Sequence, residues 1–170
     1  AKRVLDYDGL SRLFRCTRYG SGGTGNSLQD AFWYDPAGNL MKLLRQGRRT
    51  FEKFAYDGPG RTTRQYLCYN ITEYGTPTDY GAAASVNDNT VVHQNEWTYD
   101  AASNTIQQIT RERFHTASGT GELGDATTQP YARVSYQASY FDGLGRQIAQ
   151  ADYGTNAAVA WTRSDLIPLG

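Results

Sequence analysis

Apolar and polar residues alternate along much of this chain. The segment 131–140 is the clearest case: Val134, Tyr136 and Ala138 fall on one side of an extended backbone, and Arg133 and Ser135 fall on the other. A period of two residues predicts a β-strand with one buried face. Runs of this kind, bounded by glycine, asparagine and aspartate, predict an all-β chain. The predicted strands lie near residues 12–19, 29–34, 39–46, 48–56, 61–70, 91–99, 104–115, 131–141, 146–153 and 158–164.

Three polar stretches separate some of these strands, at residues 20–27, 75–90 and 116–130. They are rich in glycine or in asparagine and aspartate, so we expect loops there. Loops on a rigid scaffold are where binding specificity tends to lie. No linker or charge block divides the chain, so residues 1–170 are predicted to form a single repeat array.

A six-residue pattern recurs five times between the predicted strands. Each copy has an aromatic residue, an aspartate, a glycine-type turn, and then arginine or asparagine at the sixth position. The aromatic residues are spaced by 27, 22, 43 and 42 residues, which suggests a unit of roughly 20 residues with insertions. The copies are Tyr7-Asp8 to Arg12, Tyr34-Asp35 to Asn39, Tyr56-Asp57 to Arg61, Tyr99-Asp100 to Asn104, and Phe141-Asp142 to Arg146.

These residue types suit a β-hairpin. The aromatic ring ends a strand and buries a large area, the aspartate accepts hydrogen bonds from turn N–H groups, and a small residue allows a positive φ. The sixth position alternates strictly between arginine and asparagine. Glycine follows the aspartate in the arginine copies only, so we predict two kinds of hairpin.

The five segments strongly resemble the YD-repeat, or rearrangement-hotspot (Rhs), family. Relatives include bacterial Rhs proteins, toxin-complex shell subunits and the animal teneurins. The resemblance implies tandem antiparallel hairpins in a twisted sheet that spirals into a shell, often around a toxic C-terminal domain. Two features depart from the family. Five repeats are too few to enclose a cavity, and the aspartate-rich autoproteolysis motif is missing.

Composition and charge narrow the function further. The chain has 13 Tyr, 18 Gly and 17 residues of each charge sign, so its formal net charge is zero. A basic excess, which nucleic-acid binding usually leaves, is absent, and no apolar run of about 18 residues predicts a membrane span. We expect neither a nucleic-acid partner nor membrane insertion. Cys16 and Cys68 are expected to be separate strand thiols, with a disulfide as the alternative.

Catalytic and metal chemistry find little support. Turn geometry already accounts for the aspartates, although two of them could by accident adopt the spacing of a glycosidase pair. His93 and His115 are isolated from other ligand types, and residues 87–89 offer oxygen atoms without calcium-loop spacing. We therefore expect no catalytic residue, metal site or cofactor, and no enzyme activity.

Aromatic residues leave a binding function open. The tyrosines are expected to form a ladder between hairpins, so Trp33, Trp97 and Trp161 are the better candidates for stacking on a sugar. The main expectation is a structural extracellular or cell-surface protein, secreted by a signal outside this chain. It would be a segment of a larger shell or filament, pairing with neighbouring repeats or identical subunits through open strand edges. The alternative is a module that binds a surface glycan or a partner.

Overall fold

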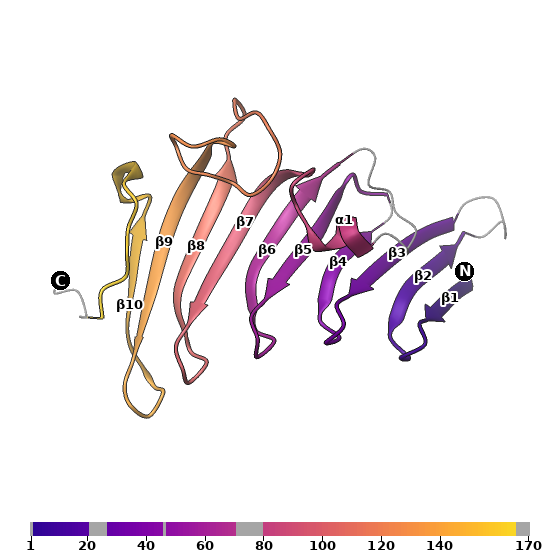
Figure 1. The fold of residues 1–170 in the computed structure, drawn as a ribbon, viewed down its shortest axis with the longest axis horizontal. Helices are drawn as coiled ribbons and strands as arrows, with labels where there is room; N and C mark the ends of the chain where they lie inside the picture. Colours follow the sequence, from indigo (N-terminus) through magenta and orange to yellow (C-terminus); the bar gives the residue numbers. More distant parts are fainter. Residues whose placement is uncertain (1, 21–26, 46, 71–79, 166–170) are drawn as a thin grey trace.

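A computed structural model describes residues 2–20, 27–45, 47–70 and 80–165. These residues form one ten-stranded antiparallel sheet in which each strand pairs with the next along the chain (Figure 1). The strands are β1 (Lys2–Tyr7), β2 (Leu13–Tyr19), β3 (Ser27–Tyr34), β4 (Leu40–Arg45), β5 (Thr50–Tyr56), β6 (Thr62–Tyr69), β7 (Thr90–Tyr99), β8 (Thr105–Arg113), β9 (Ala132–Phe141) and β10 (Gln147–Gly154). A short helix α1 (Tyr80–Ala84) and a 3-10 turn η1 (Asn156–Ala158) complete the described elements.

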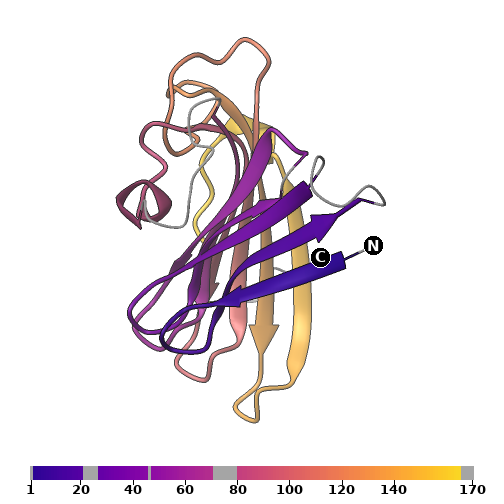
Figure 2. The same cartoon turned by 90° about the vertical axis from the view of Figure 1, so that its right-hand side faces the viewer.

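The sheet is open. Figure 2 shows the strands at the N-terminal end running obliquely to those at the C-terminal end, as the natural twist of a sheet produces. The all-β prediction is confirmed. The sheet does not close and is not strongly curled over the described residues, so the expected spiral is not seen at this length.

Two predicted boundaries are wrong. Residues 2–7 form strand β1, which the strand prediction missed, and residues 158–164 do not form a strand. The backbone takes a positive φ at Gly154, the last residue of β10, and again at Asn156, Ala157 and Ala158, so the chain turns away from the extended conformation before residue 159. The following residues fold back over the sheet, where the Trp161 ring stacks on Tyr153 with centroids 4.2 Å apart.

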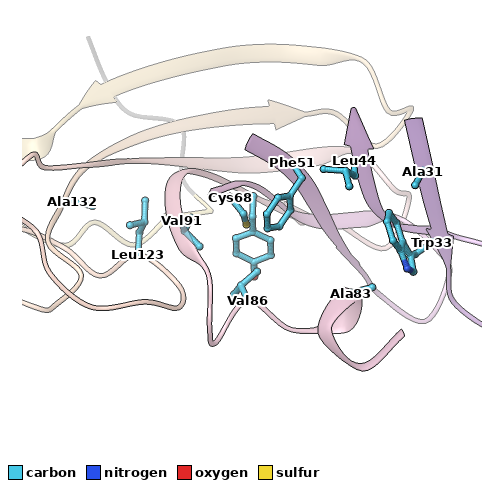
Figure 3. Close-up of a cluster of buried hydrophobic side chains, with 11 residues drawn as sticks. Ala31, Trp33, Leu44, Phe51, Cys68, Ala83, Val86, Val91, Leu123 and Ala132 are labelled. Carbon is cyan, nitrogen blue, oxygen red and sulfur yellow. The ribbon is translucent and has the colours of Figure 1, made fainter. Parts of the chain in front are cut away.

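One face of the sheet, here called the covered face, carries the hydrophobic core. Trp33, Phe51 and Val91 lie on this face and pack with Val86 and Leu123, which come from the connections between strands (Figure 3). The helix α1 and the loop at 114–131 lie on this side of the sheet (Figure 2). The opposite face, the open face, includes Trp97 and the residues that pair with it in turn across β8 and β9, Gln108 and Gln137.

Two lysines lie inside the core. Lys42 and Lys53 are each 2% exposed. The Lys53 ammonium donates to the Ala82 carbonyl at 2.5 Å, to the Ser85 carbonyl at 2.6 Å and to Asn89 Oδ1 at 2.6 Å. The Lys42 ammonium lies 4.7 Å from the Trp33 ring centroid. A buried ammonium needs such partners, and Lys53 thereby fastens the α1 segment to the sheet.

Within the described residues, no helix is long and apolar enough to cross a membrane. Cys16 in β2 and Cys68 in β6 are both buried and free, with strands β3, β4 and β5 between them.

Candidate functional site: the tyrosine–aspartate turn ladder

The five motif segments form five hairpin turns at one end of the sheet, the lower end in Figure 1. In each turn the aspartate N–H donates to the carbonyl of the sixth residue, over 2.9–3.0 Å. The N–H of the fifth residue donates back to the aspartate carbonyl, over 2.9–3.1 Å. The fifth residue has a positive φ in every copy: 60° at Ser11, 93° at Gly38, 87° at Gly60, 69° at Ser103 and 74° at Gly145.

The prediction of two hairpin geometries is therefore wrong for the backbone, since all five turns share one set of hydrogen bonds and one conformation at the fifth position. The glycine that follows the aspartate in three copies is not what shapes the turn. Gly9, Gly58 and Gly143 have no positive φ, and a Cβ at each would meet nothing within 4 Å.

Each aspartate carboxylate closes its turn from within. Oδ1 accepts the N–H of the sixth residue over 2.8–2.9 Å in every copy. Oδ2 accepts from the side chain of the same residue, which is Arg Nε in three turns and Asn Nδ2 in two, over 2.7–2.9 Å. Arginine and asparagine are thus equivalent inside the turn.

These hydrogen bonds lower the pKa of all five aspartates. For Asp8 and Asp142 the largest cause is the backbone N–H of the sixth residue, and for Asp100 it is the side chain of Asn104. For Asp35 and Asp57, partial desolvation is the largest influence and raises the pKa, but the hydrogen bonds together outweigh it. A charged, fully used acceptor suits a turn cap better than a general acid.

The motif tyrosines join each hairpin to the one before it. Their hydroxyls donate to the carbonyl of the residue just after the sixth position of the preceding hairpin. The bonds run from Tyr34 to Leu13 at 2.9 Å, from Tyr56 to Leu40 at 2.9 Å, and from Tyr99 to Thr62 at 2.7 Å. These three tyrosines form the expected ladder. Phe141 has the same place in the last turn but has no hydroxyl to donate.

Arginine differs from asparagine in reaching forward to the next hairpin. Arg61 Nη1 donates to the Asp100 carbonyl at 3.1 Å and to Ser103 Oγ at 3.0 Å, and its guanidinium lies 4.7 Å from the Tyr99 ring centroid. Arg12 likewise donates to the Asp35 carbonyl at 3.1 Å. The alternation seen in the sequence therefore corresponds to longer and shorter links between turns, not to two turn types.

The strand register beside the turns is the same at all four junctions between hairpins, and it shifts only farther along, between Leu67 and Cys68 in the β6–β7 pair. The first pair always joins the residue three after the sixth motif position to the residue four before the next aspartate. These pairs are Arg15 with Ala31, Lys42 with Lys53, Arg64 with Glu96, and Gln107 with Ala138. The turn ladder thus aligns every hairpin identically against its neighbour.

The three tryptophans have different surroundings. Trp33 is 1% exposed in the core, so it offers no ring to a surface ligand. Trp161 stacks on Tyr153 over the covered face. Trp97 is half-buried on the open face and lines a hollow of about 430 Å³ with Phe141, Gln108 and Gln137. Sequence reasoning identified Trp97 but not its glutamine neighbours, which only the strand register brings together.

The structure also places the other candidate ligands, which are the segment 87–89 and the two histidines. Asn89, in the segment considered for calcium, is 1% exposed and accepts from Lys53. Among the described residues, no group of three or more His, Cys, Asp or Glu side chains is placed to hold a metal. His93 lies opposite Glu112 in the sheet, and His115 is exposed in the loop after β8.

Comparison with known proteins identifies no family. No family model matches the sequence, and no curated protein matches it. Among solved structures, the chain is similar to one chain of the structure described as "Crystal Structure of TcdB2-TccC3-Cdc42", with 12% identity and a TM-score of 0.28. The match covers 88% of this chain and 11% of that much longer chain. A likeness this distant carries no argument about function.

Proposed function

We propose that this chain is a length of structural β-sheet wall in an extracellular or cell-surface assembly, with no catalysis of its own. The observation that carries the proposal is the turn ladder. The aspartates and the sixth residues close all five turns, and Tyr34, Tyr56 and Tyr99 each link their hairpin to the one before it. The resemblance of the motif to YD repeats supports the same function. In a longer array the twist of the sheet would accumulate, and a shell or a filament would follow from adding hairpins at its edges.

The size of the native protein tests this proposal. Material from the natural source is measured twice, as intact mass under denaturing conditions and as native mass by sedimentation. A structural wall predicts either a polypeptide far larger than 18.9 kDa or an 18.9 kDa chain inside a large complex. A free native monomer of 18.9 kDa would contradict it.

A second function, carbohydrate binding, is favoured by the hollow on the open face. Trp97 and Phe141 supply aromatic rings, and Gln108, Gln137 and Ser139 supply hydrogen-bond donors and acceptors along its wall. Sugars are recognised by this combination of flat rings and amide groups. This candidate is compatible with a structural wall. The hollow lies where the fourth and fifth hairpins meet, lined by Asn104 and Phe141, and the tyrosine and arginine links of the earlier junctions do not use these two residues.

A glycan array with three proteins tests the binding function. The unmodified chain is expected to retain one class of glycan, and Trp97→Ala is expected to lose it. Val92→Ala is the matched control, because Val92 lies in the same strand, is 40% exposed and does not line the hollow. A blank array for the unmodified chain, or equal loss in both variants, would count against the site.

A further inference from the structure

The two outer strands of the sheet carry complementary contacts. Together they match an arginine junction, by which we mean the contact of a motif arginine with the turn of the following hairpin. Among the described residues, β1 pairs only with β2 and β10 only with β9. Inside the sheet, an arginine junction needs a forward-reaching guanidinium on one side, and a tyrosine and an aspartate carbonyl on the other. The β10 edge carries the first half and the β1 edge carries the second.

Arg146 supplies the donor half. It makes the same hydrogen bonds to Asp142 as the other motif arginines make within their own turns. Its side chain is 73% exposed, however, compared with 24% for Arg12 and 26% for Arg61, which reach a following hairpin. Gln147 follows it and occupies the position whose carbonyl accepts a tyrosine hydroxyl in earlier hairpins.

The first turn supplies the acceptor half. Tyr7 is 54% exposed, whereas the tyrosines inside the ladder are half-buried. Ser11 has a φ of 60°, a conformation that favours glycine, and its counterpart Ser103 accepts from Arg61 through its hydroxyl. A serine at this position can therefore accept from an arginine, as Ser103 does, while the other receiving turn has Gly38 there and offers Arg12 only the Asp35 carbonyl. The acceptors for the incoming arginine are the aspartate carbonyl and the hydroxyl of the fifth residue. Neither belongs to the sixth residue, so a turn with arginine at its sixth position can accept the incoming guanidinium as well as a turn with asparagine there.

The constant register gives the pairing of the two edges. Ala149 lies three after Arg146, and Val4 lies four before Asp8, so these two residues would form the first strand pair. One step nearer the turns, Ile148 and Leu5 would face each other. They are 54% and 39% exposed, so the junction would cover two apolar side chains that the described sheet leaves in solvent.

We propose that the β10 edge binds the β1 edge of a second copy of this chain, so that copies add head to tail. Arg146 of one copy donates to the Asp8 carbonyl and to Ser11 of the next, and Tyr7 donates to the Gln147 carbonyl. The two contact surfaces differ, so the association is heterologous and extends as an open filament instead of stopping at a dimer. This inference rests on the proposed structural function and specifies its partner.

Disulfide trapping tests the register. Val4→Cys and Ala149→Cys are made in separate chains and mixed under oxidising conditions. A covalent dimer is expected in the mixture and not with either variant alone. Val4→Cys mixed with Ala151→Cys is the off-register control and should react far less. The native thiols contribute little background, because Cys16 is 2% exposed and Cys68 is fully buried.

Sedimentation velocity over a range of concentrations tests the contacts. Arg146→Asn keeps the turn, as Asn39 and Asn104 do in theirs, but cannot reach forward. It should raise the concentration for half-association by about tenfold, the effect of one lost charged contact. Ser11→Gly should also weaken association, while relieving the positive φ and leaving the monomer at least as stable in urea.

Two results would overturn the inference. The first is a chain that stays monomeric up to millimolar concentration. This would leave the structural function intact, because the edges would then serve hairpins of one longer polypeptide. The second is association that ignores both substitutions and forms disulfides equally in the off-register control.

Discussion

The contribution of a forward-reaching arginine can be measured inside one molecule, because the chain provides its own reference. Arg61→Asn retains the turn contact to Asp57, as asparagine does in the second and fourth turns. It removes the links to the Asp100 carbonyl and to Ser103 Oγ and the contact with the Tyr99 ring. Arg146→Asn makes the same chemical change where Arg146 has no hydrogen bond to a following hairpin among the described residues.

The magnitude follows from these contacts. A charged hydrogen bond contributes about 1.5–3 kcal/mol when well shielded, and a cation–π contact at an exposed site contributes about 0.5–1 kcal/mol. The Arg61 side chain is 26% exposed, so solvent screening reduces both. We expect Arg61→Asn to lower the free energy of unfolding by about 2 kcal/mol. Arg146→Asn should change it by less than about 0.5 kcal/mol, as surface substitutions usually do.

Urea unfolding at micromolar protein concentration measures the difference while keeping the chain dilute. With a denaturant dependence of about 2 kcal/mol per molar, Arg61→Asn should move the midpoint down by about 1 M. The Arg146→Asn midpoint should stay close to that of the unmodified chain. Equal shifts in the two variants would refute the reasoning, because they would show that arginine acts only within its own turn.

Three further predictions concern the ladder, the core and pH. Phe141→Tyr should raise the urea midpoint by about 0.5 M, because the new hydroxyl can donate to the Thr105 carbonyl and complete the ladder at about 1 kcal/mol. Lys53→Met should lower the free energy of unfolding by about 3–5 kcal/mol, because it removes the donor to the buried Asn89 oxygen and to two backbone carbonyls. Urea unfolding measures this loss, and little change would mean that water replaces the ammonium. The folded-state pKa values of the turn aspartates are lowered, so their contribution is present above about pH 4 and is lost as pH falls through those pKa values. Urea midpoints measured from pH 6 to pH 2 should therefore fall below pH 4, and a flat profile would contradict the role of the carboxylates.

Much of the fold could be predicted because local chemistry and tertiary structure agree. The turn residues fix each hairpin, and alternation fixes which strand face is buried, so nine of the ten strands appear in the sequence close to their observed bounds. Strand β1 was missed because Lys2, Arg3 and Asp6 make an outer strand look like a polar loop. The segment 158–164 resembles a strand in sequence because Val159 and Trp161 mimic alternation.

What the sequence could not reveal depends on contacts between distant segments. Lys53 is a surface residue by type, and only the docking of α1 shows why it is buried. Trp33 and Trp97 both stand next to a motif tyrosine or close to it, yet one is in the core and the other is on the open face. In the sequence, the contact of a motif arginine with the next turn shows only as an alternation of arginine and asparagine at the sixth position. The contact itself depends on how close neighbouring turns lie in the folded sheet.

The two ends of the sheet follow different rules. The five Tyr–Asp or Phe–Asp turns at one end are uniform, whereas the connections at the other end range from the short link between β4 and β5 to the long segments before β7 and β9 (Figure 1). The contacts at the end that carries the uniform turns therefore set how each hairpin aligns with its neighbour. Insertions can lengthen and diversify the opposite rim while the register beside the turns stays the same, even where it shifts farther along, as between Leu67 and Cys68. A wall built this way would show its variety on one side.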